Sequence, residues 1–149
     1  MTLKEITQAI ERVALDQPAI NMLVRNDIFR LNTYPKAKYG VFGWTQQQHM
    51  ENMDDDIITY NFTFFYVDRL NEKRSNEVDI QSVGMTTLSN IIRALQDKGI
   101  YADSWEYQTF NQRFHDECAG VYCNIALDVN VNYTCDEEFN VSTTNKIII

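Results

Sequence analysis

The sequence predicts an α+β fold, in which a mainly antiparallel β-sheet carries two helices on one face and includes a long β-hairpin arm. Two stretches repeat apolar residues at helical spacing, and several others alternate apolar and polar residues with a period of two. The chain has 149 residues, which is the usual size of one domain. We therefore expect one domain over residues 1–139 and a C-terminal tail over 140–149.

The first helix is expected over residues 2–16. Thr2 and Glu5 have the spacing of a capping box, in which two side chains satisfy free backbone N–H groups of the first turn. Pro18 is expected to end the helix near Asp16. One apolar stripe runs along it: Leu3, Ile6, Ile10 and Val13.

The second helix is expected over residues 77–98. Asn76 has the position and chemistry of a helix cap, and Asp79 lies near the positive end of the helix dipole. Gly99 suits the left-handed residue that follows a helix. The apolar stripe of this helix consists of Ile80, Leu88, Ile91 and Leu95.

Most of the remaining chain is predicted to form strands. Three short ones are expected at residues 22–24, 28–31 and 39–44, separated by residues that favour turns. A stronger pattern follows at 57–68, and another strand is expected at 107–114. The apolar face of the 57–68 strand consists of Ile58, Tyr60, Phe62, Phe64 and Tyr66.

The longest strand is expected over residues 121–135. Its odd-numbered residues are mostly apolar, whereas Asp128, Asn130 and Asn132 lie on the opposite, polar face. At about 3.3 Å per residue such a strand is roughly 45 Å long, which exceeds the usual strand of a small domain. We therefore expect it to project as a hairpin arm or to be bent by a bulge.

The acidic composition restricts the classes of function. The formal net charge is −8 and the pI is about 4.6, which argues against a nucleic-acid binder that depends on phosphate contacts. An acidic wall past which DNA slides is compatible with this charge, because it repels phosphates. The acidic run Asp54-Asp55-Asp56 is a candidate for a loop that faces such a channel.

The sequence gives few indications of where in the cell the protein is located. No apolar stretch has the roughly 18 residues of a membrane span, and the N-terminus lacks the features of a signal peptide. The three cysteines, Cys118, Cys123 and Cys135, are odd in number, so we expect reduced thiols and synthesis in a cytosol.

Side chains that could bind a metal ion or act in catalysis are concentrated in one short run. His115-Asp116-Glu117-Cys118, with His49, contains metal-ligand types, and Cys118 with His115 could act as nucleophile and base. The spacings match no zinc or catalytic motif, so the favoured interpretation is a protein that is not an enzyme and holds no cofactor. One alternative is a small cytosolic ligand-binding or enzymatic domain with a pocket near His115 and Cys118, and another is a monomeric regulatory or inhibitor module.

Several stretches resemble a known family. They are residues 57–70, followed by Ser75-Asn76 and Ile80-Gln81-Ser82, then Phe110-x-x-Arg113-Phe114, residues 118–122 and residues 135–139. Together with the opening helix, this order is similar to small neck proteins of tailed bacteriophages. It most resembles the ring or tail-terminator-like proteins of crAss-like phages, and the resemblance covers most of residues 2–140.

The resemblance implies a structural protein of the virion, made in the cytoplasm of a host bacterium. Such proteins form a ring in the head–tail connector, which joins the portal to the tail and lines the DNA channel. The implied partners are further copies of the chain, twelve or otherwise six, together with the portal or an adjacent ring and tail proteins. DNA would pass through without specific binding, and no membrane is involved.

Interface residues are expected at the polar strand face and at the C-terminus. Asp128, Asn130 and Asn132 could contact a neighbouring subunit through the strand on which they lie. Ile147, Ile148 and Ile149 end the chain after a polar stretch, and exposed isoleucines at a free end favour aggregation unless something covers them. We expect a neighbouring subunit, rather than the chain's own core, to cover them.

Overall fold

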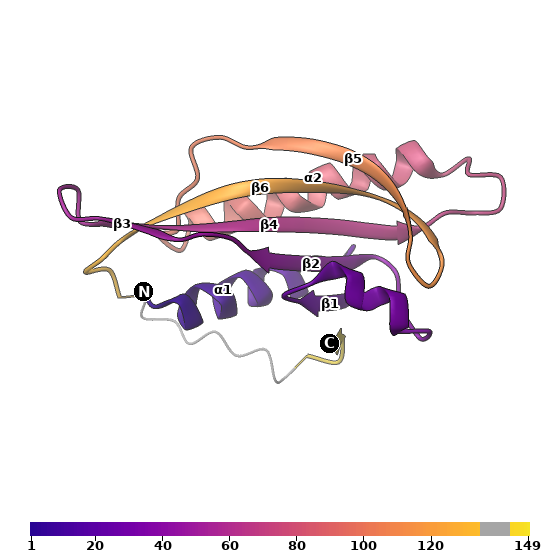
Figure 1. Cartoon of the computed structure of the whole chain (residues 1–149), viewed down its shortest axis with the longest axis horizontal. Helices are drawn as coiled ribbons and strands as arrows, with labels where there is room; N and C mark the ends of the chain where they lie inside the picture. Colours follow the sequence, from indigo (N-terminus) through magenta and orange to yellow (C-terminus); the bar gives the residue numbers. More distant parts are fainter. Residues whose placement is uncertain (135–143) are drawn as a thin grey trace.

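The chain forms a seven-stranded mixed sheet with two α-helices on one face, which confirms the predicted α+β class (Figure 1). The computed structural model describes residues 1–134 and 144–149. The strands follow the order β5-β6-β4-β2-β1-β7, and β3 pairs with β4 beyond the end of β2. Most pairs are antiparallel, whereas β1 pairs in parallel with both β2 and β7.

Helix α1 spans Leu3–Leu15 and begins with the predicted capping box. The Glu5 N–H donates to Thr2 Oγ1 at 3.2 Å, and the Thr2 N–H donates to Glu5 Oε2 at 2.6 Å. The predicted stripe is buried apart from its first member, because Ile6, Ile10 and Val13 are at most 3% exposed.

Helix α2 spans Glu77–Gln96 and lies across β4 and β6. Gly99 has a φ of +82° after its C-terminus, as predicted. The expected cap is wrong in one respect, because the Asn76 side chain makes no capping bond. It accepts from the Asn71 N–H and donates to the Arg69 carbonyl instead, so it orders the loop before the helix.

Strands β4 (Ile57–Arg69) and β6 (Glu117–Asn130) form the centre of the sheet. They pair without interruption from Ile57 with Asn130 to Arg69 with Cys118. The predicted apolar face of β4 packs under the helices, together with alternate residues of β6. The long pairing makes β6 a central strand, and its one-to-one register contains no bulge.

The limits predicted for the long strand are wrong at both ends. β6 begins at Glu117, because Cys118, Ala119 and Gly120 already pair with the end of β4. It ends at Asn130, whose side chain accepts from the Asn132 N–H at 2.9 Å and turns the chain away from the sheet. Cys135, the expected last residue of the strand, lies outside the described residues.

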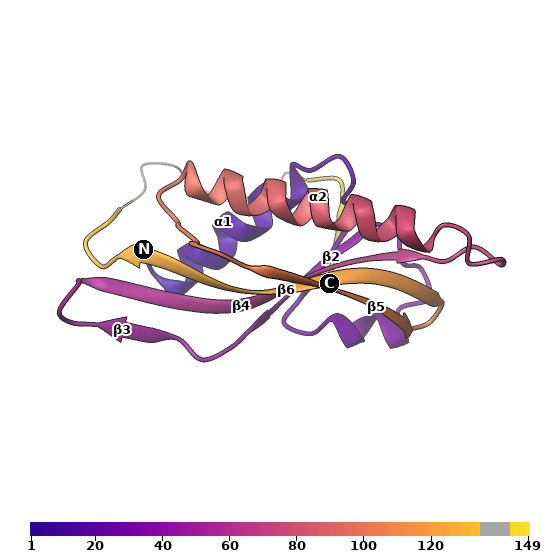
Figure 2. The ribbon, with the colours of Figure 1, turned by 90° about the horizontal axis from the view of Figure 1, so that it is seen from above.

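The segment expected as a strand at 28–31 is a 3-10 helix, η1 (Ile28–Thr33). Asp27 caps it, since its side chain accepts from the Phe29 N–H at 2.9 Å. Ile28 and Leu31 are buried beneath it, on the side of the sheet that the α-helices do not cover (Figure 2). Before and after this segment lie β1 (Met22–Arg25) and β2 (Val41–Gln46).

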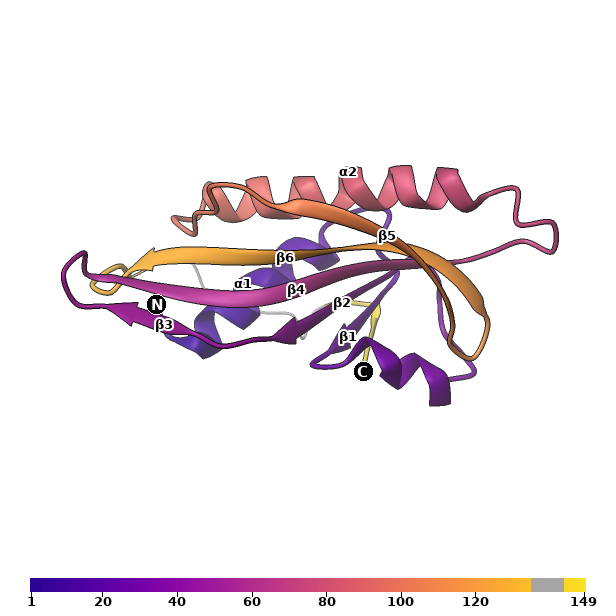
Figure 3. The same cartoon turned by 45° about the horizontal axis from the view of Figure 1, so that its top comes forward.

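The remaining strands lie at the margins of the sheet (Figure 3). β5 (Glu106–Arg113) is one edge and forms a hairpin with β6. β3 (Met50–Asn52) forms a hairpin with the start of β4, and all three of its residues are exposed. This hairpin, rather than β6, extends past the helical layer at one end of the molecule (Figure 1).

The C-terminal isoleucines form the other edge of their own sheet, so the expectation that they lie apart from it is wrong. β7 (Ile147–Ile148) pairs with β1, and Ile149 bonds to the backbone of Leu23 and Arg25 at 2.9 and 2.8 Å. Lys146 Nζ donates to the carbonyls of Leu15 and Gln17 at the end of α1. The end of the predicted tail is therefore part of the domain.

A partly buried ion pair joins α1 to β1. Arg25 Nε donates to Glu11 Oε2 at 2.6 Å, and the Glu11 side chain is only 5% exposed. We expect Arg25→Ala to lower the free energy of unfolding by about 2 kcal/mol, because it leaves a buried carboxylate without its donor. Urea denaturation measures the change. Arg113→Ala is the matched control, since its ion pair with Glu117 is exposed and should contribute little. Equal losses would contradict this account.

Candidate functional site

The predicted acidic loop lies at one end of the sheet, in the turn between β3 and β4. Asp54, Asp55 and Asp56 are all exposed, and Asp56 has a left-handed φ of 53°. Asn52 holds the turn, since its side chain donates to Asp55 Oδ2 at 3.0 Å and accepts from the Asp54 N–H at 3.0 Å. The turn thus presents three carboxylates to solvent.

The polar residues predicted for an interface lie at the same end. Asn130 pairs with Ile57, and the Val131 N–H donates to the carbonyl of Asp56 at 2.8 Å, so the end of β6 touches the acidic turn. Asn130 and Asn132 are exposed. Asp128 is half-buried, and its carboxylate accepts from Thr59 Oγ1 at 2.6 Å, so part of its bonding capacity is used within the sheet.

The His115–Cys118 run does not assemble into a reactive pair. His115 is exposed, whereas Cys118 is 1% exposed and its thiol donates to the Asp116 carbonyl at 3.4 Å. The Asp116 carboxylate accepts from the Tyr39 hydroxyl at 2.7 Å. Burial raises the pKa of Cys118 to about 11, so the thiol stays protonated at neutral pH, contrary to what a nucleophile requires. Within residues 1–134 and 144–149, no cluster of three His, Cys, Asp or Glu side chains could hold a metal ion.

Because Cys118 and Cys123 are buried, we expect the free energy of unfolding to fall above about pH 9. Burial raises the pKa of Cys118 to about 11 and that of Cys123 to about 12, from an ordinary value of 9.0. In this range the native thiols keep their protons while those of the unfolded chain ionise, so rising pH favours unfolding. Urea midpoints between neutral pH and about pH 10 check this. Replacing both cysteines by alanine should flatten the decline, and an unchanged decline would contradict the assignment.

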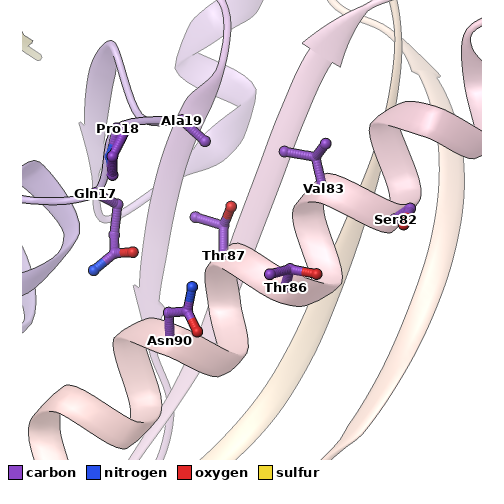
Figure 4. Close-up of a pocket in the computed structure, with 8 residues that line it drawn as sticks. All are labelled: Gln17, Pro18, Ala19, Ser82, Val83, Thr86, Thr87 and Asn90. Atoms are coloured by element: carbon purple, nitrogen blue, oxygen red, sulfur yellow. The ribbon is translucent and has the colours of Figure 1, made fainter.

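A hollow of about 340 Å³ separates α2 from the loop that follows α1 (Figure 4). Residues 17–19 form one wall. Ser82, Val83, Thr86, Thr87 and Asn90 of α2 form the other, and none of the lining residues is charged. Thr87 is buried, whereas Val83 is 43% exposed at the rim. The hollow offers short polar groups and some apolar surface, but no acid or base.

A second, apolar groove of about 190 Å³ lies on the side of the sheet that the two α-helices do not cover. Phe29 of η1 approaches Phe114 with ring centroids 5.8 Å apart, and Phe65, Phe110 and Tyr122 form a mutual cluster at 5.8 to 6.5 Å. The groove lies beside the run containing His115 and Cys118, but neither residue lines it. Its aromatic walls suit an apolar side chain.

Neither of these two surfaces was predicted from the sequence. The spacing of Phe65, Phe110 and Tyr122 on three strands is a tertiary feature that no local pattern reveals. The α2 surface had a visible signal, however, because the sequence contains no charged residue from Ile80 to Ile92. The rule that exposed helix faces carry charges would have pointed to it.

Comparison with known proteins adds no family assignment. No protein-family model matches the sequence, and no curated protein is similar to it at a significant level. Among the helices of the described residues, none combines the length and apolar character needed to cross a bilayer.

Proposed function

We propose that this chain is a structural subunit of a ring in the head–tail connector of a tailed bacteriophage, and that it is not an enzyme. The observation that carries the proposal is the exposed face of α2, which is uncharged over a long stretch although the chain has a net charge of −8. Charged residues are depleted at the centres of protein interfaces. An exposed surface of this composition favours binding to another protein over catalysis.

The acidic end of the molecule supports a ring that lines a DNA channel. Glu51, Asp54, Asp55 and Asp56 are exposed around one projecting hairpin. In a closed ring each copy would contribute the same group of carboxylates, and a negative surface lets DNA pass without binding it. The resemblance of the sequence to phage neck proteins points to the same role, with twelve or six copies joining the portal to the tail.

The alternative, a ligand-binding or enzymatic domain near His115 and Cys118, has weaker support. The thiol is buried and its pKa is raised, and the histidine is exposed. The neighbouring groove is lined by aromatic rings without a titratable group other than the Tyr122 hydroxyl. It could hold a small apolar ligand, which binding assays with a fluorescent apolar dye would detect.

Location in the particle tests the proposal. Antibodies raised against the purified chain should label particles of the phage that encodes it at the neck, between head and tail. Particles that lack the protein, while infected cells contain it, would contradict a structural role. Label on the capsid surface or tail fibres would contradict the proposed position.

A further inference from the structure

The connection between β2 and β3 forms a bulge opposite β4. β2 stops pairing with β4 at Phe62, and β3 starts pairing with it at Thr59. Residues 47–49 of the connection therefore lie opposite only Tyr60 and Asn61 of β4. An extra residue of this kind interrupts the ladder, so the backbone groups beside it need other partners.

The side chain of His49 supplies a partner that the ladder lacks. The Asn61 N–H donates to His49 Nδ1 at 3.1 Å, and the Asn61 carbonyl accepts from the Gln47 N–H at 2.8 Å. The Asn61 side chain donates to the carbonyl of Gln48 at 2.6 Å. These bonds converge on Asn61 and hold the bulge against β4.

This geometry fixes the protonation state of His49. Because Nδ1 accepts a hydrogen bond, it carries no proton, and the neutral ring carries its proton on Nε2. Nε2 lies 3.2 Å from Gln46 Oε1, which can accept that proton. The half-buried ring also packs against Tyr60 and Phe62, with centroids 5.3 and 5.6 Å apart. A second proton can enter the ring only at Nδ1, and the Asn61 N–H then loses its acceptor.

The ionisable groups near the imidazole come from β3, β4 and α1, whereas residues 46–48 are all glutamine. Burial, together with the carboxylates of Glu51 and Glu5, raises the pKa of the Tyr60 hydroxyl, so this group stays neutral at and below neutral pH. The same hydroxyl donates to the carbonyl of Met1, which brings the N-terminal amino group to this side of the sheet. Carboxylates ordinarily titrate at about pH 4 and histidines at about pH 6.5, so mild acid changes histidines first.

We propose that His49 is a pH-sensitive clip that holds the β3–β4 hairpin, with the acidic turn at its tip, against the rest of the sheet. At neutral pH the imidazole accepts from Asn61 and closes the bulge. Opening of the hairpin frees Nδ1 to take up a proton, so falling pH favours the open form. All three residues of β3 are exposed, and few buried contacts therefore oppose the opening. The clip acts within one chain, whether or not the chain forms a ring.

Hydrogen exchange of the Asn61 backbone amide, followed by NMR at about pH 7.5 and about pH 5.5, tests the clip. After correction for the intrinsic effect of pH on exchange, the protection of this amide should fall on the order of tenfold in the intact chain. The amide of Leu88, in the buried part of α2, should keep its protection, because the opening is confined to the hairpin.

Two substitutions of His49 separate the hydrogen bond from the titration. In His49→Asn a carbonyl oxygen can replace Nδ1 as acceptor but takes up no proton in this range, so the Asn61 amide should be equally protected at both pH values. His49→Phe offers no acceptor and should leave that amide weakly protected at both. The matched control is His115→Asn at the chain's other histidine, which is exposed, and it should keep the pH dependence of the intact chain.

Equal protection of the Asn61 amide at both pH values in the intact chain would overturn the proposal. A fall of the same size in His49→Asn would also overturn it, because the titrating group would then lie elsewhere, at the N-terminal amino group, Glu5 or Glu51. Full protection in His49→Phe would show that the imidazole is not needed to close the bulge. A parallel fall at Leu88 would show that acid destabilises the whole domain, which contradicts a local clip.

Discussion

Phe62→Asp is expected to leave the chain unfolded. Phe62 is fully buried in the middle of β4, with its ring centroid 5.9 Å from that of Trp44 and 6.2 Å from that of Phe64. Removing a buried phenylalanine costs about 3–5 kcal/mol, and an unpaired buried carboxylate adds several more. Together these losses approach the whole stability of a domain, about 5–15 kcal/mol. Far-UV circular dichroism and solubility on expression would report the loss.

The control for this substitution introduces the same charge at a solvent-exposed position. Thr109→Asp lies on the edge strand β5 at an exposed position and should fold normally. Leu88→Asp, on the buried face of α2, should fail to fold as Phe62→Asp does. Soluble, native-like protein from both core variants would contradict the assignment of the sheet face and the α2 stripe to one core.

Deleting residues 144–149 is expected to destabilise the monomer by about 4 kcal/mol. The deletion removes β7, whose isoleucines are half-buried, and uncovers the backbone of β1. It also removes Lys146 Nζ, which donates to two carbonyls at the end of α1. Thermal and urea unfolding of the truncated chain measure the effect.

Asn145→Ala is the control within the same segment, because its side chain is exposed, and it should unfold like the intact chain. A truncated chain as stable as the intact one would contradict the role of β7 as a strand of its own sheet. It would also restore the simpler expectation of a tail that binds only a neighbouring subunit.

The sequence was most informative where one apolar pattern runs over many residues. Both α-helices and the central strands β4 and β6 follow from such patterns, and the predicted inward faces are buried apart from Leu3 and Ile58, which are half-buried. The 3-10 helix was missed because the run 28–31 is rich in strand-forming residues. Its spacing of buried residues, Ile28 and Leu31, together with the Asp27 cap, is nevertheless helical.

The remaining errors concern pairing between distant segments. β7 joins the sheet because β1, far away in the sequence, offers a parallel edge, and no local pattern identifies a partner of that kind. The acidic turn and the polar end of β6 were singled out separately, and the β4–β6 register brings them together. The aromatic groove depends on three strands and η1, so it could be recognised only in the folded chain.

Cryo-electron microscopy of the phage neck tests the proposed role most directly. We expect a closed ring of this chain between portal and tail, in which each subunit shows the seven-stranded sheet with two helices on one face. The turn containing Asp54, Asp55 and Asp56 should face the DNA channel. A neck reconstruction in which every density is explained by other proteins, with no ring of this fold, would contradict it.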